Sequence, residues 1–108
     1  MQGLLITLLI LLMAPRLGNS AGSSEGAELF QQHCAACHIK GGNIIRRGKN
    51  LKLKALERQG IASVDAIAQI AREGVGQMSG YGELLGPGGD QIVAEWIWEQ
   101  AQKAWIQG

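Results

Sequence analysis

The amino-acid sequence predicts an all-α domain with long loops, and three observations support this class. Apolar residues recur at helical spacing over residues 63–74 and 90–105. No stretch alternates apolar with polar residues in the way that a half-buried strand does. The chain has 16 glycines in 108 residues, and they gather between the helical segments, where glycine ends helices and forms loops.

The N-terminal segment has the composition of a secretory leader. Residues 4–14 are apolar apart from Thr7. Such a run is too short to cross a bilayer, which needs about 20 residues, and it matches the apolar core of a signal peptide. We therefore expect residues 1–21 to be cleaved after export, leaving residues 22–108 as one domain with no stable membrane insertion. An uncleaved anchor or an ordinary buried helix is the alternative.

Two helices are expected in the first half of the remaining chain. Residues 22–24 are small and should form a flexible start, followed by a helix over residues 25–34. A glycine-rich loop begins at Lys40 and runs to Asn50. We expect Asn50 to cap a short helix over residues 51–59.

Two further helices are expected in the second half. Ser63 should cap the third helix, and Gly74 should end it. Residues 74–86 contain five non-consecutive glycines, which predicts an irregular loop that can lie against a flat group. Asp90 should cap the last helix. The apolar stripe of that helix is broad and comprises Ile92, Val93, Trp96, Ile97, Ala101, Ala104 and Trp105.

The charge of the chain gives no support to nucleic-acid binding. Ten basic and nine acidic residues leave a net charge of +1, and removal of Arg16 with the leader would bring it to zero. The basic residues are nevertheless clustered, with no acid between them, at Lys40, Arg46, Arg47, Lys49, Lys52 and Lys54. This basic segment is either a solvated loop or a surface for an acidic partner or the propionates of a haem.

The chemistry-bearing motif is C-x-x-C-H, formed by Cys34, Cys37 and His38. This spacing is typical of covalent c-type haem attachment. Two thiols three positions apart on a helical turn can both form thioethers with the haem vinyl groups, and His38 is then held beneath the ring to bind iron. One covalent haem c would also supply a core that a domain of this size lacks.

Three other interpretations of the motif are weaker. A redox-active dithiol of the thioredoxin kind follows a strand, and no strand is predicted here. A zinc site needs four ligands, which His33 and His38 cannot comfortably complete beside two neighbouring cysteines. A structural disulfide would leave His38 without a role.

Met78 is the candidate for the second axial iron ligand. Met1 and Met13 belong to the expected leader, so Met78 is the only methionine that remains, and it lies in a glycine-rich loop rather than on an apolar helix face. His33 is tethered beside Cys34 on the proximal side and cannot easily reach the other face. Histidine and methionine together are the ligands of electron-carrying cytochromes c.

Ligation by both residues predicts a soluble one-electron carrier and not an enzyme. An iron bound on both sides has no vacancy for oxygen or peroxide, and the thioether favours ferrous iron. The alternative is a haem enzyme or gas-binding protein whose sixth iron position is open or labile.

Most of the chain after the leader resembles the cytochrome c6 group of class I cytochromes c. The matching stretches are GAELFQQHCAACH, NIIRRGKNLKLKALERQG, SVDAIAQIAREGVGQMSGYGELL and VAEWIWEQAQKAW. The resemblance implies an all-α class I cytochrome c fold of about four helices wrapped around one haem. It also implies that the first and last helices cross at Gly26, with Phe30 packed on Trp96.

The resemblance implies a role as well. Members of the family are monomers of the thylakoid lumen that carry electrons from the cytochrome b6f complex to photosystem I or a terminal oxidase; export to a bacterial periplasm is the related possibility. Asn43 and Lys49 would lie near the haem propionates. Ser79 replaces the proline that commonly follows the axial methionine, and Ile70 replaces a glutamine near the haem. These departures imply a lower potential, as in c6-like variants. Donation to photosystem I stays the leading prediction, and a low-potential variant with a different partner is the alternative.

Overall fold

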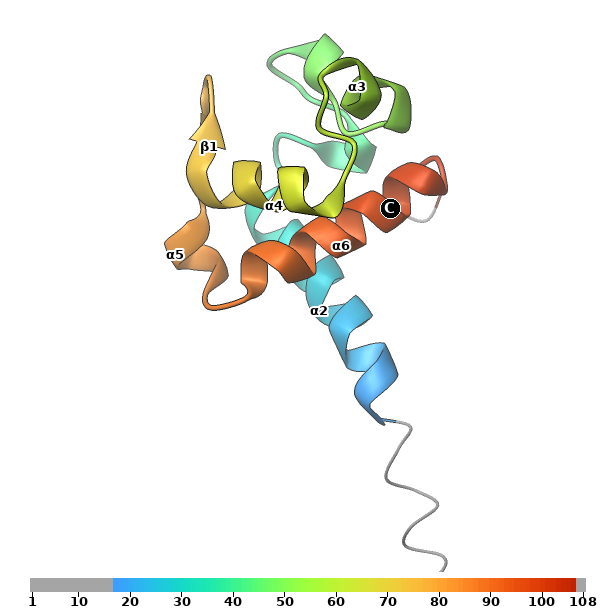
Figure 1. The fold of residues 1–108 in the computed structure, drawn as a ribbon, viewed down its shortest axis with the longest axis vertical. Coiled ribbons are helices and arrows are strands. Elements are labelled where there is room, and N and C mark those ends of the chain that lie inside the picture. The colour runs from blue at the N-terminus through green and yellow to red at the C-terminus, as the bar shows by residue number, and fades with distance from the viewer. Residues whose placement is uncertain (1–16, 107–108) are drawn as a thin grey trace, which may run out of the picture.

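The computed structural model describes residues 17–106 of the chain, and side chains from residue 24 onward. Its elements confirm the all-α class, and helices surround a small core (Figure 1). In chain order the elements are α2 (Leu17–His33), the 3-10 turns η2 (Ile39–Gly41) and η3 (Arg47–Lys49), α3 (Leu53–Arg58), α4 (Val64–Glu73), β1 (Gly74–Val75), β2 (Met78–Ser79), α5 (Gly82–Leu85) and α6 (Gly89–Gln102).

The first and last helices of the described residues, α2 and α6, cross closely, as the family resemblance implied (Figure 1). A β-carbon at Gly26 would lie 2.6 Å from Cβ of Trp96 and 3.0 Å from the carbonyl oxygen of Ile92. Only glycine therefore allows α2 and α6 to approach this closely. One turn further on, the Phe30 ring packs on Trp96 with a centroid distance of 5.0 Å.

The core is built mainly on α6. Phe30 and Trp96 contact Trp105 with ring centroids 5.4 and 5.7 Å away, and these tilted and edge-on pairs are favourable aromatic geometries. Helix α4 packs on the other side of α6 through buried small and branched side chains at Ile67, Ala68 and Ala71. A deep core of aromatic and aliphatic side chains thus lies between α2, α4 and α6.

The ends of α4 follow the predicted caps. The Ser63 hydroxyl accepts a hydrogen bond from the Ala66 N–H at 3.1 Å, which satisfies a free amide at the helix start. Gly74 ends the helix with a φ of +83°, in the left-handed region that glycine adopts without strain.

Two expectations about the first half of the chain were wrong. Residues 22–24 are helical rather than flexible, because α2 begins at Leu17. Residues 17–33 contain no proline that would end the helix before it reaches the turns packed around Gly26. Asn50 does not cap α3: its side-chain oxygen accepts the Lys52 N–H at 2.9 Å, and Lys52 holds the cap position without a side-chain bond.

Three expectations about the second half also need correction. Residues 74–86 are not wholly irregular, because Gly74 pairs with Ser79 in a two-residue antiparallel hairpin and α5 follows. Gly88, with a φ of +76°, precedes α6, so Asp90 lies inside the first turn. Ala104 is exposed beyond the helix end, with a φ of +58°, and is not part of the apolar stripe.

The predicted leader, residues 1–21, falls mostly outside the described part of the chain, which includes only its last five residues. Within residues 17–106, no helix combines the length and the apolar character that spanning a membrane requires.

Candidate haem site

The C-x-x-C-H motif forms a tight turn directly after α2. The Cys34 N–H donates to the Phe30 carbonyl at 2.8 Å, and the His38 N–H donates to the Cys34 carbonyl at 3.0 Å. These turn hydrogen bonds hold Cys34 and His38 close together. Both sulfurs are free: Cys37 is exposed, and Cys34 is half-buried against the core.

Burial decides the ionisation of one of the two thiols. Desolvation, with a smaller contribution from neighbouring Cys37, raises the pKa of the Cys34 thiol to about 11. Cys34 therefore stays protonated near neutral pH. A protonated thiol binds metal ions poorly, because the thiolate is the metal-binding form. It does keep the hydrogen that adds to the vinyl group when a thioether forms.

His38 is oriented by the backbone that follows it. Its side chain is buried, with 9% exposed, and Nδ1 lies 2.7 Å from the carbonyl oxygen of Gly42. A carbonyl can only accept, so Nδ1 carries the hydrogen and Nε2 is left with a lone pair for a metal. This fixes both the tautomer and the ring direction, as is usual for a histidine that binds metal.

The loop that supplies this carbonyl is itself held by the far end of the chain. Gly41 has a φ of +80°, and a β-carbon there would lie 2.5 Å from the Trp105 ring. The Trp105 indole N–H donates to the Leu51 carbonyl at 3.1 Å, while the Leu51 N–H donates to the Gly41 carbonyl at 2.7 Å. The C-terminal tryptophan thus fastens the segment that orients His38.

Met78 lies on a different part of the fold. It is half-buried in β2, opposite Val75 of β1, in the hairpin that follows α4 (Figure 1). The chain then returns to α4, where the Tyr81 N–H donates to the Ala71 carbonyl at 2.8 Å. The sequence predicted the glycine-rich setting of Met78 but not this ordered hairpin.

The other predicted residues near the haem lie as follows. The Asn43 side chain donates to the Lys49 carbonyl at 2.9 Å and accepts the Ile45 and Arg46 N–H groups, so it organises the basic segment from within. Ile70 is half-buried on α4. His33 lies at the end of α2, with its ring 6.1 Å from that of Tyr81, the residue that precedes α5.

The residues around the motif fit a haem. Two free thiols lie on one turn, an imidazole nitrogen is available, and large aliphatic side chains near the motif and the hairpin are more than half exposed in the polypeptide alone. Such exposed apolar surface is what a flat porphyrin would cover. These side chains are Ile39, Ile44, Ile45, Val75 and Leu84. Among the described residues, no three histidine, cysteine or acidic side chains gather as a metal cluster, which argues against the zinc interpretation.

Crossed terminal helices around a C-x-x-C-H turn define a c-type cytochrome domain. Residues 21–97 match the family model for cytochrome C oxidase, cbb3-type, subunit III. The chain is 45% identical over 87 residues to a cytochrome c6-like protein of Nostoc sp., covering 81% of this chain and 78% of the relative. It is 37% identical over 101 residues to cytochrome c6 of Synechococcus sp. strain PCC 6312, covering 94% and 88%.

A solved structure agrees with these relatives. The crystal structure of cytochrome c6B from Synechococcus sp. WH8102 is 72% identical and superposes with a TM-score of 0.77, covering 80% of this chain and 98% of that one. The chain therefore belongs to the cytochrome c6 family, as a c6-like variant. It carries one covalently attached haem c and serves in electron transport.

Proposed function

We propose that this chain carries single electrons on a haem whose iron is bound by His38 and Met78, with Cys34 and Cys37 as its thioether anchors. The observation that carries the proposal is the 2.7 Å contact between His38 Nδ1 and the Gly42 carbonyl, because it leaves Nε2 for iron. Met78 is the only methionine after the expected leader, and its glycine-rich hairpin is compact enough to approach a ring. When bound, the haem supplies a one-electron couple.

The polypeptide contributes rigidity to this function. Trp105 holds the loop behind His38, and α4 holds the hairpin that bears Met78. A site held in place from both sides changes little when the iron changes charge, which keeps the reorganisation small and favours a carrier over an enzyme. A haem enzyme or gas-binding protein is the competing function, and carbon monoxide binding to the ferrous protein would favour it.

Ile70 should lower the reduction potential. It is half-buried on α4, while Ile67 and Ala71 of the same helix are fully in the core. We expect Ile70→Gln to raise the midpoint potential by on the order of 50 mV, because an amide N–H donated toward the haem stabilises the extra electron by about one hydrogen bond. Potentiometric titration measures the shift.

The matched control is Ile70→Leu, which keeps the apolar character and should leave the potential unchanged. A potential that rises equally in both variants would show that packing, not polarity, acts at this position. A high potential in the unmodified protein would favour donation to photosystem I over another acceptor.

The partners that we propose are membrane electron-transfer complexes: the cytochrome b6f complex as donor, and photosystem I or a terminal oxidase as acceptor. We further propose that the protein is a monomer. Residues 1–21 would direct its export to the thylakoid lumen or a bacterial periplasm and would then be cleaved. A relative named chloroplastic cytochrome c6, from Arabidopsis thaliana, is 35% identical and supports the lumenal location.

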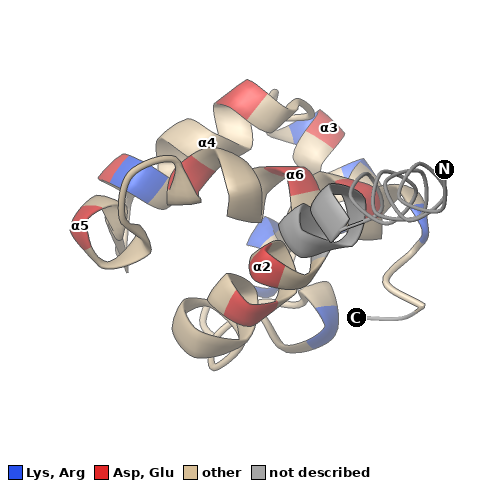
Figure 2. Cartoon of the chain, turned by 90° about the horizontal axis from the view of Figure 1, so that it is seen from below, with Lys and Arg blue, Asp and Glu red and all other residues tan. Residues whose placement is uncertain are grey.

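The basic segment is suited to an acidic face on such a partner. Figure 2 shows acidic positions on α2, α5 and α6, whereas the cations between residues 40 and 54 are all exposed. Among the described residues, the ion pairs involve Arg72 and none of these cations. They are therefore free to steer a negatively charged partner.

We expect neutralising Arg46 and Arg47 together to slow reduction of the partner complex about threefold at low salt and to flatten its ionic-strength dependence. Stopped-flow kinetics measure both effects. Lys103→Gln removes an exposed charge at the end of α6 and serves as the control. An equal change in the control would assign the effect to net charge and not to this segment.

A further inference from the structure

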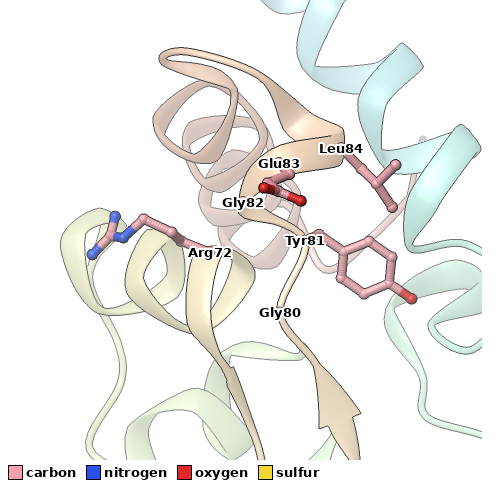
Figure 3. Close-up of a pocket in the computed structure, with 6 residues that line it drawn as sticks. All are labelled: Arg72, Gly80, Tyr81, Gly82, Glu83 and Leu84. Atoms are coloured by element: carbon pink, nitrogen blue, oxygen red, sulfur yellow. The ribbon is translucent and has the colours of Figure 1, made fainter.

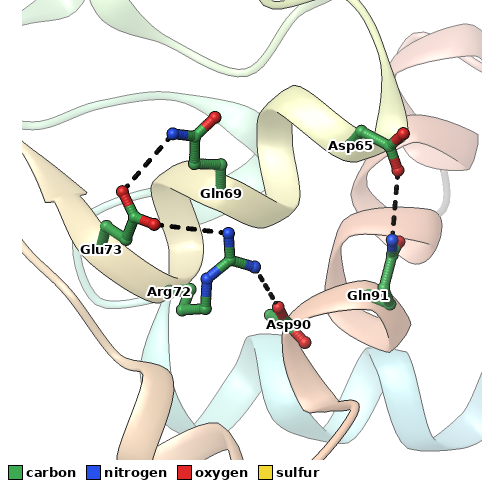
Figure 4. A network of polar contacts seen from close by, with 6 residues as sticks. All are labelled: Asp65, Gln69, Arg72, Glu73, Asp90 and Gln91. Atoms are coloured by element: carbon green, nitrogen blue, oxygen red, sulfur yellow. Dashed lines mark hydrogen bonds and ion pairs between the residues drawn. The ribbon is translucent and has the colours of Figure 1, made fainter.

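The methionine hairpin belongs to a longer loop, residues 74–88, whose two ends lie close together. We call the place where these ends meet the neck of the loop. The loop leaves α4 after Glu73 and rejoins the helical body where α6 begins at Gly89. Arg72 stands two residues before its first residue, Gly74, and Asp90 stands two residues after its last, Gly88. The two side chains meet across the neck, with Arg72 Nη1 2.5 Å from Asp90 Oδ2 (Figure 4).

Inside the neck, the loop backbone is pressed against the last turn of α4. A β-carbon at Gly80 would lie 2.5 Å from the Arg72 carbonyl oxygen, and one at Gly82 would lie 3.1 Å from Arg72 Cγ. A β-carbon at Gly74 would lie 2.5 Å from the Met78 carbonyl oxygen. Figure 3 shows the same stretch, Gly80 to Leu84, passing beside Arg72 along a surface hollow. The residues that directly follow the hairpin are therefore packed against Arg72.

The contact across the neck is an ion pair between Arg72 of α4 and Asp90 of α6. The Arg72 side chain is 46% exposed and that of Asp90 17%, so this is a surface ion pair, whose contribution is modest. Glu73 also approaches Arg72, at 3.4 Å, and accepts from Gln69 at 3.5 Å, but both of these residues belong to α4 itself. Within residues 17–106, Asp90 is the one side chain with a polar contact that joins Arg72 to the far side of the neck. In agreement, the Arg72 contact is the main cause that lowers the pKa of Asp90.

We infer that Arg72 and Asp90 act as a positioning pair that closes the neck of the methionine loop and so holds the Met78 sulfur on the iron. The inference rests on the proposed ligation by Met78. With the ends of the loop tied together, fewer open loop conformations are accessible. Separating them raises the population in which the sixth iron position is open.

The test is binding of imidazole to the ferric holoprotein, since imidazole can bind iron only when the sulfur has left. The apparent dissociation constant varies inversely with the fraction of open molecules. We expect Arg72→Gln to tighten imidazole binding about fivefold, and Asp90→Asn to have a similar effect. The double variant should bind no more tightly than either single variant, because the same contact is lost in all three. Arg72→Lys, which keeps the charge, should bind more weakly than Arg72→Gln.

The fold offers a matched control at the other end of α4. The Gln91 side chain donates to Asp65 at 3.1 Å, which joins α6 to the first turn of α4 instead of its last turn (Figure 4). Asp65→Asn should leave imidazole binding within about twofold of the wild type. Equal effects of Asp65→Asn and Arg72→Gln, or no effect of Arg72→Gln and Asp90→Asn, would overturn the inference.

The same spectra separate this inference from the proposed function. If the wild-type ferric protein shows the weak far-red band of sulfur–iron ligation and yet its neck variants bind imidazole as the wild type does, only the positioning role fails. If the wild type lacks that band, ligation by Met78 fails, and the positioning role fails with it.

Discussion

Replacement of Met78 by alanine is expected to abolish the far-red sulfur–iron band of the ferric protein and to lower the midpoint potential by on the order of 100 mV. The soft thioether stabilises ferrous iron more than ferric iron, so its loss favours the ferric state. The vacated position should also bind carbon monoxide in the ferrous protein. Absorption spectroscopy and potentiometric titration measure these effects on the same sample.

Met78→His is the informative companion to this variant. It supplies a second nitrogen ligand, so it should keep the iron six-coordinate and exclude carbon monoxide while still lowering the potential. A Met78→Ala protein with an unchanged spectrum and potential would contradict the proposed ligation. Carbon monoxide binding to the wild type as strong as to Met78→Ala would instead support the gas-binding alternative.

Gly26→Val is expected to have the largest effect on folding. Even the β-carbon would approach Trp96 Cβ to 2.6 Å, and the neighbouring Ile92 carbonyl is backbone that cannot rotate away. Helices α2 and α6 would have to separate, which would open the aromatic core between them. We expect a loss of about 3 kcal/mol or more in unfolding free energy, measured by denaturant titration of the holoprotein.

Gly48→Val is the control, because it makes the same substitution at a glycine outside the helix crossing. Gly48 lies in the exposed basic segment, and a β-carbon there would meet nothing within 4 Å. Its unfolding midpoint should stay within a small shift of the wild-type value. If Gly26→Val were as stable as Gly48→Val, the close crossing of α2 and α6 would not be a requirement of this fold.

The parts of the site that are local in sequence could be predicted from it. Cys34, Cys37 and His38 fall within one turn, so their spacing alone indicated their chemistry. The Ser63 cap and the Gly74 stop depend on a few neighbouring residues, and the structure has both. The crossing at Gly26 was implied by resemblance and agrees with the contacts.

Features that depend on distant contacts could not be predicted in the same way. The pairing of Gly41 with Trp105 spans most of the domain, and nothing near either residue signals it. Asp90 has the residue type of a helix cap, but its charge is used by Arg72 instead, which is a tertiary contact between α4 and α6. Where a side chain could play either of two roles, tertiary contacts decide between them, and the neighbouring sequence does not.

The anchoring of the His38 loop by Trp105 has a consequence for biogenesis. A chain translocated from its N-terminus delivers residues 34–42 well before Trp105 emerges. Until then the indole N–H cannot bond to Leu51, and the ring cannot pack on Gly41. If the chain is exported as we propose, the segment that orients His38 therefore lacks its tryptophan anchor until the C-terminal residues have been delivered.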